Sequence, residues 1–279
     1  TQGDKEKLKL RTFYSKRALT IYPMFWIAFL VANLFHLWRS GWQFGQTPWW
    51  RIIFSVFAVD GYVANMHVST FYTLGEWFLG FILIFYAIFP LLRVGVKKYP
   101  VPTAVIVGIL YVVTILSSFT VLQLPQDLLL TVRLPEIIFG MYFVRYIKHV
   151  SHAVGVGSMI FLILQQWKEF LSGPLAVTFV GIAFFLALVW LCQLIGQPSK
   201  VIEYPVNWVS KFSYAIFLTH HVIIVDVFAL FSDYMHWSQL HIYGLFLFDY
   251  VIIAIASVVL FYVEKFIVRG GTAIGSVLT

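Results

Sequence analysis

The stretch PLAVTFVGIAFFLALVWLCQLI, residues 174–195, decides the class of fold, because it is a long apolar run without a single charge. It lies in an uncharged region, Phe170–Ser199, that has two counterparts at Ala18–Trp38 and Val101–Gln126. A helix rises 1.5 Å per residue, so about 20 apolar residues cross the roughly 30 Å of hydrocarbon in a bilayer. The apolar runs are continuous and do not alternate with polar residues, which indicates membrane helices and not barrel strands.

The composition supports a membrane protein and argues against several other classes. Of the 279 residues, 61% are hydrophobic and 11% are charged, whereas an ordinary soluble domain has about 25% charged residues. The net charge of +7 does not indicate a nucleic-acid partner, because the basic residues cluster at the ends of the apolar runs, beside anionic lipid. The single cysteine, Cys192, leaves no disulfide and no cysteine-based zinc site, and we expect no metal.

We expect an all-α, polytopic membrane bundle that forms one domain over residues 1–279. Its eight predicted spans are 18–38, 71–92, 101–119, 128–146, 153–166, 174–195, 208–228 and 242–264. A further apolar patch, Trp50–Ala64, contains Asp60 and Gly61 and follows Pro48. We predict that this patch is re-entrant or interfacial and does not span the membrane.

The charge of the connections tests that assignment. If Trp50–Ala64 does not span, five basic segments lie on one side: the N-terminal segment 1–17, the loops 93–100, 145–152 and 196–207, and the tail 265–279. The other side then holds Asp127, Asp233 and a His-rich loop. This positive-inside pattern predicts a multi-pass protein of the plasma or inner membrane, with both ends of this chain in the cytoplasm.

Polar residues interrupt the run 208–228 in the block FSYAIFLTHH, residues 212–221. Polar groups at membrane depth are costly and indicate a functional site by default. His220 is a candidate proton acceptor, and Asp226 follows closely enough to orient an imidazole. Adjacent His220 and His221 point about 100° apart on a helix, so they cannot face one site equally. The structural alternative is a histidine that is hydrogen-bonded to a neighbouring helix.

Three further groups of polar residues each allow a functional and a structural interpretation. Lys16 and Arg17 stand where the chain enters the membrane, and they can bind phosphate or anchor the helix. Glu76 lies near the outer end of a span, where it can act as a base or can simply be an interfacial residue. Arg133 and Glu136, spaced i and i+3, can neutralise each other or line a polar cavity. The sequence contains no HExxH, Gly-rich phosphate loop or GxSxG motif.

Taken in order, these motifs resemble the membrane-bound acyltransferase 3 family, whose members O-acylate cell-envelope glycans and other extracytoplasmic acceptors. The matching blocks are Lys16–Pro23, Trp77–Leu79 with Tyr86 and Pro90, Leu134–Glu136 with Phe139–Gly140, Ser213–His220, and Tyr262–Lys265. Thr20 stands where a second basic residue is common, and Phe266 where the family closes with proline. The family's first span, which carries an Arg and a His, has no counterpart, so we expect a chain shortened at its N-terminus.

The resemblance implies an O-acyltransferase that takes acyl-CoA, most often acetyl-CoA, as its cytoplasmic donor. The acceptor would be a hydroxyl of a cell-surface glycan outside the membrane. The donor would be held by basic side chains: Lys16, Arg17 and Arg133. Catalysis would use His220 as the base, with Glu76 and Tyr214. The acceptor would be held by four residues: Trp77, Glu136, Ser213 and His221.

Two other functions fit the same residues. A transporter or flippase for a lipid-linked glycan or an organic anion would use the intramembrane charges as a substrate path and proton relay. An inactive or accessory membrane subunit would fit if the family's first-span histidine never existed in this protein. Substrate-dependent release of free CoA separates the enzyme from the carrier, because only the enzyme produces it.

Overall fold

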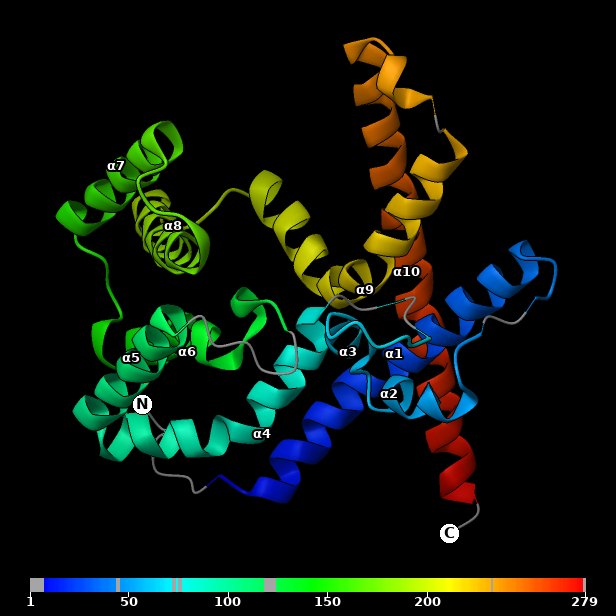
Figure 1. Ribbon diagram of the computed structural model, residues 1–279, viewed down its shortest axis with the longest axis horizontal. Coiled ribbons are helices and arrows are strands. Elements are labelled where there is room, and N and C mark those ends of the chain that lie inside the picture. The colour runs from blue at the N-terminus through cyan, green and yellow to red at the C-terminus, as the bar shows by residue number, and fades with distance from the viewer. Residues whose placement is uncertain are drawn as a thin grey trace. The chain divides into compact units, whose positions relative to one another are not determined.

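The computed structural model describes residues 8–43, 46–71, 74, 77–117, 124–231 and 233–277, with side chains up to residue 268 (Figure 1). Over these residues the chain is helical, without a strand. Their α-helices are α1 (Leu10–Arg39), α2 (Ile52–Val56), α3 (Asp60–Ala64), α4 (Trp77–Lys98), α5 (Pro100–Leu116), α6 (Leu130–Tyr142), α7 (His152–Lys168), α8 (Gly173–Ile195), α9 (Lys200–Leu230) and α10 (Gln239–Val277). Shorter turns of helix are η2 (Trp49–Arg51), η3 (Gln126–Leu128), η4 (Phe143–Ile147) and η5 (Tyr234–His236).

Five helices are long and apolar enough to cross a membrane: α1, α4, α8, α9 and the part of α10 up to Val268. They match five of the eight predicted spans. The other three predicted ranges are also helical, but α5, α6 and α7 have only 17, 13 and 17 residues. Local signals set two of these lengths. The α-helical part of α6 passes into a π-helical turn at Phe143, and a left-handed residue, Glu169, ends α7.

The chain packs as two compact units, one formed by residues 1–80 with 203–279 and the other by residues 81–202. In the first unit α1 packs against α10 (Figure 1). The side chains of Phe25 on α1, Leu218 on α9 and Ser257 on α10 are fully buried there. The core of this unit therefore forms where these three helices meet, and the polar block 212–221 lies on one of them.

The patch Trp50–Ala64 does not form a continuous helix, in agreement with the prediction that it does not span. It breaks into η2, α2 and α3, and Ala58 between the last two has a left-handed backbone with φ of 58°. Two side chains of α1 hold this segment in place. Tyr22 donates to the backbone oxygen of Phe57 at 3.3 Å, and Trp26 donates to that of Val56 at 3.1 Å.

The second unit has its own core between α4, α5 and α6. Its buried residues are Phe85, Leu92, Val96, Val107, Leu134 and Ile138. In the same unit α7 and α8 lie side by side (Figure 1). Their contact depends on Gly155, because a Cβ atom at this position would lie 2.1 Å from the Trp190 ring.

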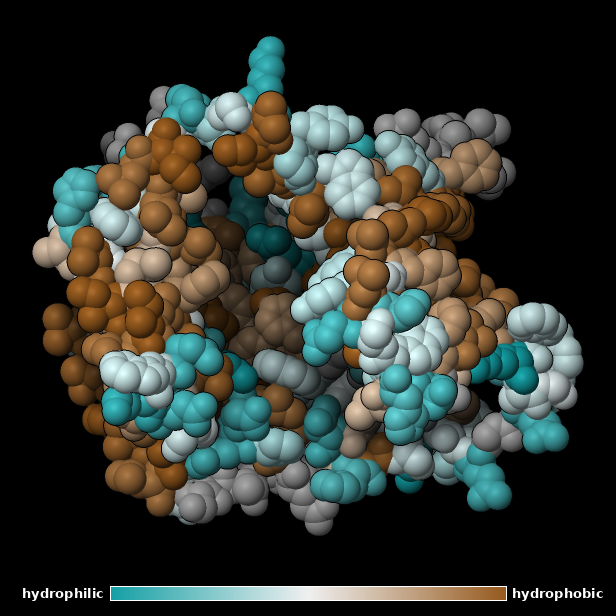
Figure 2. Space-filling view, turned by 90° about the horizontal axis from the view of Figure 1, so that it is seen from above, coloured by the Kyte–Doolittle hydropathy of each residue, from teal (hydrophilic) through white to brown (hydrophobic). Residues whose placement is uncertain are grey.

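Large apolar side chains cover much of the outside of the helices. Figure 2 shows broad areas of apolar residues on the side of the molecule that it presents. On α8, for example, Phe179, Phe184 and Leu188 are exposed. Water would disfavour so much exposed apolar surface, whereas lipid chains accommodate it without cost. The protein is a multi-pass membrane protein by these criteria.

Candidate active site

The polar block of α9 presents a row of rings along one side of the helix. Tyr214 and Phe217 stack with ring centroids 6.4 Å apart, and Phe217 lies 6.1 Å from His220. Phe217 also meets Phe78 at the start of α4, edge to face at 5.8 Å. Spacings of three residues place side chains on the same face of a helix, which explains the row. His220 thus stands at the end of an aromatic face and is half-buried.

The backbone of α9 determines which nitrogen of His220 can accept a proton. Its Nδ1 atom lies 2.9 Å from the carbonyl oxygen of Phe217 and 3.2 Å from that of Ile216. Carbonyl oxygens only accept hydrogen bonds, so Nδ1 carries the hydrogen of the neutral ring. Nε2 then presents its lone pair, and no described residue donates to it. This tautomer is the one that a general base at Nε2 requires.

The prediction that Asp226 orients an imidazole is wrong, because Asp226 pairs with an arginine and not with a histidine. Asp226 accepts from Arg39 at 2.5 Å, in an ion pair between the end of α1 and α9. Asp226 is six residues after His220, which is more than one and a half helical turns. Its side chain therefore lies on a different face of α9 from His220. Arg39, whose role the sequence did not reveal, therefore takes up the carboxylate.

The hydroxyl groups of Tyr214 and Ser213 donate hydrogen bonds to backbone carbonyl oxygens. The Tyr214 hydroxyl donates to the carbonyl oxygen of Ile21 on α1 at 3.0 Å, which joins α9 to α1. The Ser213 hydroxyl donates to the oxygen of Ser210 in its own helix at 3.0 Å. His221 lies next to His220, with ring centroids 6.5 Å apart. The structure thus brings Tyr214, His220 and His221 together, and their catalytic and binding roles stay predictions.

An acid that the sequence analysis missed lies on α10. Asp249 is only 3% exposed, and its Oδ1 atom has no hydrogen-bond partner. It shares one buried face of α10 with Leu245, Ile253 and Ser257. The signal was present in the sequence, because Asp249 is the only charged residue between Ile242 and Val263. A lone acid inside a predicted span is itself an indication of function.

The predicted donor-binding cations of α1 lie in its first turns. Lys16 and Arg17 are exposed, and the Arg17 guanidinium stands 5.5 Å from the centroid of the Phe13 ring. Both follow the basic segment at the N-terminal end of the helix. The same helix carries Ile21, the acceptor for Tyr214, one turn further on. Exposed cations in this position can reach phosphate groups at a membrane surface.

Two further predicted residues lie at the start of α4. Glu76 falls outside the described residues, so its predicted catalytic role stays a prediction. Trp77 is the first residue of α4, with its ring 6.0 Å from that of Phe78. Because Phe78 in turn contacts Phe217, Trp77 belongs to the same aromatic group as the polar block of α9.

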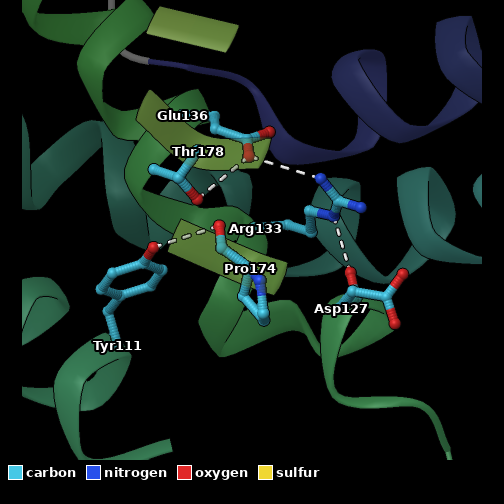
Figure 3. A network of polar contacts seen from close by, with 6 residues as sticks. All are labelled: Tyr111, Asp127, Arg133, Glu136, Pro174 and Thr178. Atoms are coloured by element: carbon cyan, nitrogen blue, oxygen red, sulfur yellow. Dashed lines mark hydrogen bonds and ion pairs between the residues drawn. The ribbon is translucent and has the colours of Figure 1, made fainter. Parts of the chain in front are cut away.

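Arg133 and Glu136 lie in the second unit and form the ion pair that their spacing predicts (Figure 3). The guanidinium of Arg133 lies 3.4 Å from Glu136 and donates through Nε to the backbone oxygen of Asp127 at 2.7 Å. Thr178 of α8 donates to the same Glu136 oxygen at 3.3 Å. Figure 3 shows these groups around one carboxylate between α6 and α8. The two charges neutralise each other, and a role in binding donor or acceptor stays a prediction.

Asp60 is a second buried acid, in the segment that packs on α1. It is 1% exposed, and neither of its carboxylate oxygens has a hydrogen-bond partner. The hydroxyl of Ser55, also buried and unpaired, lies near it. Burial raises the pKa of the Asp60 carboxyl to about 6, and the Ser55 hydroxyl limits the rise. The sequence analysis used Asp60 only as a reason against a span.

An apolar cavity of about 400 Å³ lies between α1, α9 and α10 in the first unit. Its polar side chains are Thr219, which pairs with Ser257 at 3.0 Å, and Asp226, which pairs with Arg39. The cavity therefore offers few polar contacts to a nucleotide or a sugar. Among the described residues no three His, Cys, Asp or Glu side chains are placed to hold a metal ion.

Comparison with models of protein families shows the family to which the chain belongs. The family model for the acyltransferase 3 domain, described as "Acyltransferase domain", matches residues 3–263. The match covers most of the chain, and the protein belongs to this family. It is therefore an enzyme, a membrane acyltransferase, and the family match favours this function over the transporter. Searches of curated proteins and of solved structures found no match.

Proposed function

We propose that this acyltransferase moves an acetyl group from cytoplasmic acetyl-CoA to a hydroxyl of a cell-surface glycan. The family fixes the type of reaction, and the positive-inside pattern supports a cytoplasmic donor. An acceptor outside the membrane follows from the resemblance of the motifs. In this orientation α1 begins at the cytoplasmic face and α9 ends at the outer face.

The observation that carries the proposal is the state of His220. Its Nδ1 atom is held by two backbone carbonyl oxygens, which leaves Nε2 as a proton acceptor inside a membrane helix. A histidine with a defined tautomer is suited to general base catalysis at neutral pH. The only other histidine of α9 is its neighbour, His221.

A single base is enough for the proposed acetyl transfer, because it takes one proton and later returns it. His220 Nε2 takes the proton of the acceptor hydroxyl while the oxygen attacks the thioester carbonyl carbon. The carbon–sulfur bond breaks, and the CoA thiolate leaves with the bonding electron pair. The imidazolium then returns its proton to the thiolate, so the products are the acetyl ester and free CoA. The base is neutral again, and no other reactant is consumed.

The remaining predicted residues would bind the two substrates. Lys16 and Arg17 would hold the CoA phosphates at the inner face, with Arg133 as a further cation. Tyr214 and Glu76 would position the acceptor or the acyl carbonyl. The acceptor would also contact four side chains: Trp77, Glu136, Ser213 and His221. Arg133 and Glu136 belong to the second unit.

The test is the ester-linked acetyl content of the surface glycans of source cells with and without the gene. Loss of acetyl from one polymer supports the proposal and identifies the acceptor. Unchanged acetylation of every polymer overturns it. Restoring the gene as His220→Gln is expected to leave the polymer unacetylated. His236→Gln, which changes an exposed histidine of η5, is the matched control and is expected to restore acetylation.

A further inference from the structure

Asp249 is a buried acid without a complete set of hydrogen bonds. It is 3% exposed, and its Oδ1 atom has no partner. Removing a carboxylate from water costs several kcal/mol unless another charge or hydrogen-bond donors compensate. A buried acid in this position is compensated either by a bound proton or by a positive charge nearby. No Lys or Arg is paired with it among the described residues.

Two contacts place Asp249 at the packing surface between α10 and α9. Phe246, one turn toward the start of α10, meets Phe228 of α9 at 5.8 Å. Ser257, two turns toward the end of α10, meets Thr219 of α9 at 3.0 Å. Asp249 is buried between these points, on the face that includes Ser257. The register of these contacts places Asp249 opposite residues 225–227 of α9, about one and a half turns beyond His220.

Asp249 and His220 lie on two helices that pack against each other, with no hydrogen bond between the two side chains, so their charges can interact only through space. The other acid on this part of α9, Asp226, is occupied by Arg39 at 2.5 Å. His220 already uses Nδ1 on the carbonyl oxygens of its own helix, so Asp249 has no need to hold the ring by a hydrogen bond. The carboxylate can instead act through its field, which is strong where water is excluded.

We propose that Asp249 is the positioning residue for catalysis by His220, a carboxylate that stabilises the imidazolium formed when Nε2 takes the acceptor proton. This inference rests on the proposed function. The positive charge exists only between removal of the proton from the hydroxyl and its return to the CoA thiolate. Asp249 therefore lowers the barrier to the transfer and contributes little to the binding of either substrate.

The experiment measures release of CoA by the purified full chain in detergent. It uses acetyl-CoA and the glycan whose acetyl esters are lost from cells without the gene. Asp249→Asn removes the charge at nearly constant shape and is expected to lower kcat about tenfold or more, with the KM for acetyl-CoA unchanged. Asp249→Glu keeps the charge and is expected to recover part of kcat. Asp226→Asn and the exposed-site control Asp233→Asn are expected to keep kcat within about twofold.

Rates are referred to the folded fraction, measured by size-exclusion chromatography, so that loss of protein is not counted as loss of rate. A folded Asp249→Asn with wild-type kcat, or with a raised KM alone, overturns the inference. So does a folded Asp249→Glu that is as slow as Asp249→Asn, because the inference requires the charge. If no glycan loses acetyl and the wild type releases no CoA, the proposed function fails and the inference with it.

Discussion

At His220 the helix backbone decides which ring nitrogen is available for chemistry. Residues three and four positions earlier supply the carbonyl oxygens that fix the hydrogen on Nδ1. The arrangement needs no second residue to set the tautomer, in contrast to a triad in which a carboxylate does so. A carboxylate near this histidine can therefore serve its charged state alone, which is the role assigned to Asp249.

The residues of this site differ in how far the sequence could predict them. His220 was predictable because a histidine within an apolar run is rare and costly. The partner of Asp226 was not, because Arg39 lies 187 positions away in the chain and on another helix. Tyr214 gave a catalytic signal, but its hydroxyl bonds to Ile21, a contact that only the packing of α9 on α1 creates.

Asp60 predicts a pH dependence of stability. The pKa of the Asp60 carboxyl is raised in the folded protein, so between pH 3.8 and about 6 the carboxyl is ionised in the unfolded chain and still protonated in the folded one. The contribution of Asp60 is therefore most favourable below pH 3.8 and is lost as the pH rises through about 6. The rise in pKa from 3.8 to about 6 corresponds to a cost of up to about 3 kcal/mol above pH 6. Asp60→Asn removes this cost.

Thermal unfolding in detergent at pH 5 and pH 7.5 measures the effect. Asp60→Asn is expected to unfold at a higher temperature than the wild type at pH 7.5, with a smaller difference at pH 5. The exposed acid Asp233, changed to Asn, serves as the control and should show no such trend. A stabilisation that is equal at both pH values would contradict the assignment to a buried carboxylate.

Tyr214→Phe tests whether the hydroxyl of this residue serves structure or chemistry. Its hydrogen bond to Ile21 joins α9 to α1, so its loss should lower the free energy of unfolding by about 1 kcal/mol. If that bond is the whole role of the hydroxyl, the acyl-transfer rate of the folded variant changes little. Tyr243→Phe, at an exposed tyrosine of α10, is the matched control for stability. A folded Tyr214→Phe without acyl transfer would assign the hydroxyl to catalysis.

At the scale of single helices, packing of α7 on α8 depends on one glycine. A side chain at Gly155 would meet the Trp190 ring at 2.1 Å, whereas nothing lies within 4 Å of a side chain at Gly157. Gly155→Ala should therefore destabilise the protein by about 1–3 kcal/mol through overpacking. Gly157→Ala should be neutral or stabilising, because alanine favours the helix by up to about 1 kcal/mol. Equal melting temperatures for the two variants would contradict this packing.

We predict that the first turns of α1 bind the acyl-CoA donor. Lys16 and Arg17 are exposed there, and changing both to Ala should weaken acetyl-CoA binding about tenfold or more, because two phosphate contacts are lost. The double variant of Lys97 and Lys98 removes the same charge from the end of α4 and is the control. Isothermal titration of the detergent-solubilised protein measures the affinity. Equal weakening in both variants would indicate a general effect of charge and no site at α1.

Helices were easier to predict than their lengths. Continuous apolar runs predicted α1, α4, α8, α9 and α10, because these runs are long and carry few charges. The run 128–146 predicted one span, but the helix has an α-helical part of 13 residues followed by a π-helical turn. Hydropathy does not encode that change of hydrogen-bond pattern. Trp50–Ala64 was predictable as an interruption because Asp60, Gly61 and Pro48 all disfavour a span.

At the scale of the whole molecule, the family match and the contacts give complementary information. The match runs from residue 3 to residue 263 and so includes both compact units. The aromatic face, His220 and Asp249 all belong to the first unit, while the Arg133–Glu136 pair belongs to the second. A membrane acyltransferase has to bring a donor and an acceptor together, and the two units contribute different groups for this: a histidine with a free Nε2 in the first and a neutralised ion pair in the second.

The orientation of the chain in the membrane gives the last prediction, because the mechanism needs Lys16 inside and an acceptor outside. The positive-inside pattern places the end of α4 in the cytoplasm and the connection between α9 and α10 outside. In a Cys192→Ser background, which removes the single native cysteine, Met235→Cys should react with a membrane-impermeant maleimide on intact cells. Lys98→Cys should react only after the membrane is permeabilised, which also shows that the site is reachable. The reverse pattern would place the basic start of α1 outside, where there is no acyl-CoA, and would remove the case for a cytoplasmic donor.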